Sequence, residues 1–134
     1  MSITAESIGA AADRIAGRIR RTPVLEVEGS AFGLSHGIAL KLEHTQITGS
    51  FKVRGAFNTL LSQDYAGRDV VAISGGNHGA AVAYAATQLG LSSTVFVPWA
   101  IGKPEKVKRM ERFGAKVRLV DGSNADAFGA GARH

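Results

Sequence analysis

The feature that most limits the fold of this 134-residue chain is a long segment, residues 70–102, that contains no Asp, Glu, Lys or Arg. A membrane-spanning helix does not explain it, because Ser, Gly, Asn, His, Gln and Pro interrupt the segment and no run of about 18 apolar residues exists. Strands of a parallel sheet that are buried on both faces also lack charges. The segment therefore predicts the interior of an α/β domain.

Around this segment, patterns typical of strands alternate with patterns typical of helices. We expect strands at 70–74, 94–98 and 116–120, and helices at 78–90 and 104–113, with a last helix capped by Ser123 or Asn124. Such alternation predicts a parallel sheet with right-handed crossovers and flanking helices. Ligands bind such sheets at the carboxyl ends of the strands.

The chain before this domain predicts three shorter elements. Residues 4–19 place apolar side chains at helical spacing, and Thr4 can cap that helix. Residues 38–43 alternate as in a short strand, and an amphipathic helix is expected at 50–63.

Lys52 stands among small and aromatic residues at the start of the helix expected over 50–63. A lysine is a nucleophile only after it loses its proton. Burial and the positive end of a helix dipole both disfavour the charged form. A lysine buried at a helix N-terminus is therefore suited to form an imine with a carbonyl compound. The alternative interpretation is an exposed charge in the first turn of a surface helix.

A glycine-rich segment, Ser74 to Gly79, joins the first expected strand to the following helix. Glycines at a helix N-terminus leave backbone N–H groups without partners, which favours binding of an anion. Ser74 and Asn77 add side-chain donors. The segment is not a dinucleotide-binding loop and has no Walker lysine. Taken alone, it is also consistent with a turn that only caps a helix.

The two motifs together resemble the fold-type II pyridoxal-phosphate enzymes, and most closely the threonine/serine dehydratases, with serine racemase as a near relative. The resemblance covers residues 20–121 and rests on the order and spacing of several further segments. These are Arg21-Thr22-Pro23, Leu40-Lys41-Leu42-Glu43, Gln46, Lys103-Pro104 with Lys106, and Phe113-Gly114-Ala115-Lys116-Val117.

The resemblance implies the N-terminal part of a tryptophan synthase β-like fold. Residues 1–45 would belong to the larger domain, and residues 46–134 would form the smaller domain, with the Schiff-base lysine. The family's second glycine-rich loop, which cradles the cofactor phosphate, comes from a C-terminal half that is not in this sequence. We therefore expect the chain alone to bind pyridoxal phosphate weakly and to turn over little. We expect it to form a homo-oligomer or to need a complementing C-terminal half.

The resemblance also assigns roles to residues of both motifs. Lys52 would carry the cofactor and move protons at the substrate α-carbon, Phe51 would pack against the cofactor ring, and Asn77 would donate a hydrogen bond to the ring 3′-oxygen. Ser50 would either cap the helix or help to position the cofactor or substrate. Arg54 is expected to form a structural ion pair. The substrate carboxylate would be received by Ser74, Gly75, Gly76, Asn77 and His78, and the alternative role of His78 is to order the turn.

The implied reaction is a β-elimination that converts L-threonine or L-serine to a 2-oxo acid and ammonia. An amino-acid racemase or a dehydratase of another 3-hydroxy amino acid is an alternative within the family. A catalytically inactive remnant that serves as a binding module is an alternative outside it.

Composition disfavours several other classes of protein. The net charge is +5, but acidic residues are mixed among the basic ones and aromatic residues are not interleaved with them, which argues against nucleic-acid binding. The chain has no cysteine and its histidines are dispersed, so no metal site is predicted. No signal peptide is visible, and a cytoplasmic protein is expected.

Overall fold

The computed structural model describes residues 3–65 and 67–134. Its helices are α1 (Ala5–Arg14), α2 (Lys52–Leu61), α3 (Asn77–Gln88), α4 (Pro104–Arg112) and α5 (Asn124–Ala132), and its strands are β1 (Val24–Val27), β2 (Ile38–Lys41), β3 (Val70–Ile73), β4 (Ser93–Pro98) and β5 (Lys116–Val120). Three short 3-10 turns, η1 (Gly29–Phe32), η2 (Glu43–Thr45) and η3 (Trp99–Ile101), complete the order.

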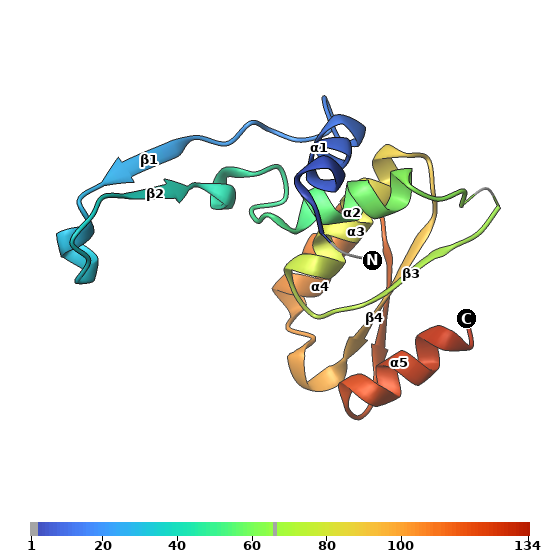
Figure 1. Cartoon of the computed structure of the whole chain (residues 1–134). Helices are drawn as coiled ribbons and strands as arrows, with labels where there is room; N and C mark the ends of the chain where they lie inside the picture. The colour runs from blue at the N-terminus through green and yellow to red at the C-terminus, as the bar shows by residue number, and fades with distance from the viewer. Residues whose placement is uncertain (1–2, 66) are drawn as a thin grey trace.

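The strands β3, β4 and β5 form a parallel sheet in that order, which confirms the prediction of an α/β fold. Helices α3 and α4 lie against one side of the sheet and α5 lies against the other (Figure 1). The middle strand, β4, is buried at every position. This two-sided burial explains why the segment around it carries no charged residue.

Helix α3 is buried between the sheet, α2 and α4. Its buried positions are almost all glycine or alanine, which allows these neighbours to approach closely. Helix α2 lies along α3 and buries Val53, Phe57 and Leu60. The ring of Phe57 meets the edge of Tyr84 at a centroid distance of 6.1 Å. This packing fixes the start of α2 relative to the sheet.

The strands β1 and β2 form an antiparallel hairpin that extends away from the rest of the molecule (Figure 1). The strand expected at 38–43 is confirmed as β2, but β1 was not predicted. The base of the hairpin is held by hydrogen bonds rather than by a core. Lys41 Nζ donates to the carbonyl oxygen of Thr22 at 2.6 Å, and Thr22 Oγ1 donates to Glu43 Oε1 at 2.6 Å.

The first helix is shorter than predicted. Thr4 caps α1 as expected, in a capping box with Ser7, but the helix ends at Arg14 instead of continuing to Ile19. Gly17 has a φ of 74°, a left-handed conformation that ends helical structure. None of the helices in the described part of the chain is long and apolar enough to cross a bilayer.

Gly79 lies where α3 comes closest to the sheet. A Cβ at this position would lie 2.8 Å from the carbonyl oxygen of Ser74 and 3.0 Å from Val95 Cγ1. We predict that Gly79→Ala lowers the free energy of unfolding by about 1–3 kcal/mol, because the backbone would have to move. Urea denaturation followed by circular dichroism measures this.

Gly9→Ala is the matched control. Gly9 lies inside α1, and a Cβ there would meet no atom within 4 Å. It should stabilise the chain by about 0.5–1 kcal/mol through helix propensity. If the two substitutions changed the free energy of unfolding by the same amount, the atoms around Gly79 would not restrict a Cβ at that position.

Candidate functional site

Lys52 is the first residue of α2, so the predicted helix N-terminus is confirmed, although the helix begins at residue 52 and not at 50. Of the two interpretations of Lys52, burial and exposure in the first turn of the helix, the structure of this chain shows exposure. Ser50 does not cap α2, whose N-cap is Phe51. Instead Ser50 is 8% exposed, and its buried hydroxyl oxygen has no hydrogen-bond partner among the residues that the structure describes.

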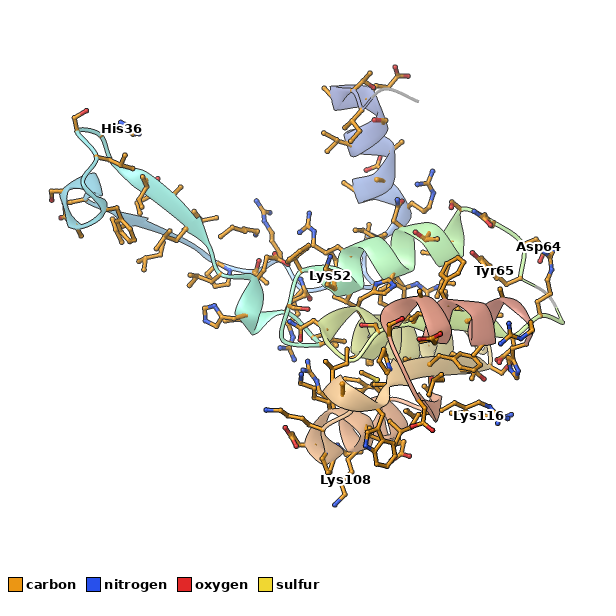
Figure 2. The ribbon with its side chains drawn as sticks, turned by 90° about the horizontal axis from the view of Figure 1, so that it is seen from below. His36, Lys52, Asp64, Tyr65, Lys108 and Lys116 are labelled. Carbon is orange, nitrogen blue, oxygen red and sulfur yellow. The ribbon has the colours of Figure 1, made fainter. Side chains whose placement is uncertain are left out.

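Lys52 opens onto a cavity of about 420 Å³ between α2, α3 and β3. Phe51 and His78 also line this cavity, and the Lys52 ammonium lies 4.8 Å from the centroid of the Phe51 ring. Figure 2 labels Lys52 at the start of α2. The remaining walls are mainly apolar and are formed by Gly55, Ala56, Thr59, Leu60, Tyr65, Val70, Val71, Ala72 and Val82.

The glycine-rich loop joins β3 to α3 as predicted, and α3 begins at Asn77. The backbone N–H of Ser74 donates to the carbonyl oxygen of Phe96 at 3.0 Å, which holds the start of the loop to β4. Ser74 Oγ accepts a hydrogen bond from the N–H of Gly76 at 3.2 Å. The N-cap Gly76 gives α3 no side-chain cap, so the first N–H groups of this helix are available to an anion.

His78 reaches the same cavity as Lys52 from the first turn of α3. Burial of part of the ring lowers the pKa of His78 below its usual value of 6.5, and the nearby positive charge of Lys52 lowers it further. The neutral form of the imidazole is therefore favoured at pH 7. A neutral imidazole carries one N–H donor and one acceptor nitrogen.

Asn77 lies on a different side of the loop from the Lys52 cavity. It lines a small pocket of about 60 Å³ together with Gly76, Ala80, Lys106, Arg109 and Met110. Asn77 Oδ1 accepts a hydrogen bond from Arg109 Nη1 at 3.3 Å. The structure thus brings Phe51, Lys52 and His78 together in one cavity and places Asn77 with Arg109 in a separate pocket.

Nothing in the sequence pattern points to Arg109, since 32 positions of sequence, with the whole of β4 among them, separate it from Asn77. Arg54 forms the expected ion pair, with Glu43 Oε1 at 3.5 Å. This pair connects α2 to the base of the hairpin.

A larger hollow of about 810 Å³ lies at the tip of the hairpin, where the end of β1, the connection with η1 and the start of β2 line it. Lys52 and the residues of the glycine-rich loop do not line it, so the cavity at Lys52 remains the candidate site. Among residues 3–65 and 67–134, no group of three or more His, Asp or Glu side chains is arranged to hold a metal ion.

The family described as "Pyridoxal-phosphate dependent enzyme" matches residues 15–134. The chain belongs to this family. The resemblance inferred from the two motifs is thereby confirmed at the level of the family and of its cofactor.

The chain is similar to an L-threonine ammonia-lyase from Geobacter sulfurreducens, with 38% identity over 88% of this chain and 30% of the relative. A maize serine racemase superposes with a TM-score of 0.87 at 31% identity, over 99% of this chain and 41% of the racemase. A threonine deaminase from T.th. gives a TM-score of 0.83 at 33% identity, over 98% of this chain and 41% of the deaminase. The chain thus spans well under half the length of these relatives.

The proximity of Lys52 to His78 predicts that the charge of Lys52 lowers the pKa of His78. In the folded chain, the NMR titration midpoint of His78 should lie below 6.5, and Lys52→Met should raise it, though not to 6.5, because the partial burial remains. The unfolded state binds this proton more readily than the folded state, so His78 makes the fold less stable as the pH falls below about 6.5.

Lys108→Met serves as the control, since Lys108 is exposed on α4 and points away from Lys52 in Figure 2. It should leave the midpoint of His78 unchanged. A midpoint that does not move in Lys52→Met would show that the two side chains do not interact.

Proposed function

We propose that this chain supplies the lysine and the carboxylate-binding loop of an enzyme that converts L-threonine or L-serine to a 2-oxo acid and ammonia by β-elimination. The observation that carries the proposal is the cavity of about 420 Å³ shared by Lys52, at the start of α2, and His78, at the start of α3. The similarity to an L-threonine ammonia-lyase and a threonine deaminase supports the choice of reaction.

The cavity at Lys52 fits pyridoxal phosphate. Its volume lies in the range of small-molecule sites, its walls are mainly apolar, and an amine and an aromatic ring stand at its rim. Lys52 would hold the cofactor and Phe51 would pack against its ring. Asn77 does not line this cavity, and it would donate to the ring oxygen from the neighbouring pocket at the start of α3. When bound, the cofactor supplies an electron sink for the pair of electrons left at the substrate α-carbon.

The chain's own residues supply binding and proton transfer. The uncapped N–H groups of α3 receive the substrate carboxylate, since the start of a helix carries partial positive charge. Gly75, Gly76 and Ser74 shape the loop that presents these groups. Neutral His78 can donate its N–H to the same carboxylate, and Lys52 Nζ takes the proton from the α-carbon.

Racemisation of a small amino acid is the second candidate reaction, because the maize serine racemase superposes over 99% of this chain. Racemisation also begins with removal of the proton from the α-carbon, but a proton is then returned to the opposite face of that carbon. Incubation with L-serine separates the two reactions, since pyruvate indicates the lyase and D-serine indicates the racemase.

We also propose a division of the chain near residue 45. The hairpin would belong to a larger domain, and residues 46–134 would form the smaller domain.

The two edges of the parallel sheet support association with further protein. In the described part of the chain β3 and β5 each pair with only one strand, so each has backbone groups that another strand could pair with. A second copy of the chain or a complementing C-terminal half would provide such contacts.

Titration of the purified chain with pyridoxal phosphate tests the proposal. We expect a saturable visible absorbance band with weak affinity, because the family resemblance implies a second, phosphate-cradling glycine loop that these 134 residues do not include. Lys52→Ala should abolish the band, and Lys108→Ala should leave it intact. No band, or an equal band in Lys52→Ala, would mean that this chain does not hold the cofactor and acts as a binding module at most.

A further inference from the structure

Arg109 joins the two segments that carry the proposed site. It lies on α4, is partly buried, and extends one nitrogen to each segment. Nη1 donates to Asn77 Oδ1 at 3.3 Å, and Nη2 donates to the carbonyl oxygen of Thr48. Asn77 starts α3, while Thr48 lies in the turn that leads into Lys52.

The geometry of the turn at Thr48 is adapted to this contact. Thr48 is 1% exposed, and Gly49 follows with a φ of 69°, a conformation that favours glycine. A Cβ at Gly49 would lie 3.4 Å from Arg109 Nη2. The turn therefore presents its carbonyl oxygen to the guanidinium with no side chain in between.

The chemistry of the guanidinium determines which end of the Asn77 amide faces it. Arginine only donates hydrogen bonds, so the group that Asn77 turns toward Arg109 must be its oxygen. The NH₂ end of the amide is then left free to donate elsewhere. A lysine could satisfy one of the two acceptors but lacks the rigid fork that reaches both.

We infer that Arg109 is a positioning residue of the site. It fixes the amide of Asn77 so that its NH₂ group is available to a ligand oxygen, and it ties the Thr48 turn to the start of α3. This inference rests on the proposed function, in which the ligand oxygen belongs to pyridoxal phosphate.

The first measurement needs no cofactor. The side-chain amide signals of Asn77, assigned by their absence in Asn77→Ala, are followed by NMR in the wild-type chain and in Arg109→Ala. We expect two well-resolved signals in the wild type and signals close to those of a solvated amide in Arg109→Ala. Arg112→Ala, an exposed arginine of the same helix, should leave them unchanged.

The second measurement is a double-mutant cycle on cofactor affinity. Arg109→Ala should weaken pyridoxal phosphate binding about fivefold to tenfold, the size of effect produced by losing one well-formed hydrogen bond. In an Asn77→Ala background the same substitution should have almost no further effect, because the amide that it orients is gone. Arg109→Lys should give an intermediate affinity, since it keeps the charge and one of the two contacts.

The outcomes distinguish this inference from the function on which it rests. If Arg109→Ala weakens binding equally in both backgrounds, Arg109 acts only through the fold and the inference is overturned. Unchanged Asn77 signals in Arg109→Ala would overturn it as well. If the wild-type chain forms no absorbance band, the proposed function fails, and the NMR measurement alone decides whether Arg109 orients the amide.

Discussion

The rest of the structure depends on how tightly helix α3 is enclosed. The sheet, α2 and α4 all contact it, so its side chains are small on nearly every side. Larger side chains would separate these neighbours, and a close-packed interior tolerates little added volume. The same enclosure brings the start of α2 beside the start of α3. The position of Lys52 next to the glycine-rich loop is therefore a consequence of packing along the whole length of α3.

The sequence predicts the parts of the fold that are encoded by neighbouring residues. The strands β3, β4 and β5 and the helices between them follow from apolar runs, glycine turns and the early proline of α4. Ser123 was expected as one of two possible caps, and its hydroxyl accepts from the N–H of Ala125 and Asp126. The loop from Ser74 to Gly79 was predicted with the helix that follows it, because glycines mark such a turn locally.

The remaining features depend on contacts between distant residues. Strand β1 is short and mostly exposed, so its sequence lacks the alternation of a half-buried strand, and it is ordered by pairing with β2. The exposure of Lys52 depends on which other elements cover the start of α2, and the sequence around Lys52 does not predict those contacts. Arg109 was missed for the same reason, since its two partners belong to other elements and its sequence context is that of an ordinary basic surface helix.

The charges around the start of α3 favour an anionic ligand. Lys52 lies on one side of the loop, Lys106 and Arg109 lie on the other, and the helix itself contributes partial positive charge at this end. The positive charge of Lys52 is one cause of the lowered pKa of His78, so protonation of His78 is already disfavoured by the charges that surround it. A ligand that brings a carboxylate or a phosphate relieves this repulsion. A ligand that is held by groups which only the fold brings together binds the folded chain in preference to the unfolded chain, and its binding therefore makes the fold more stable.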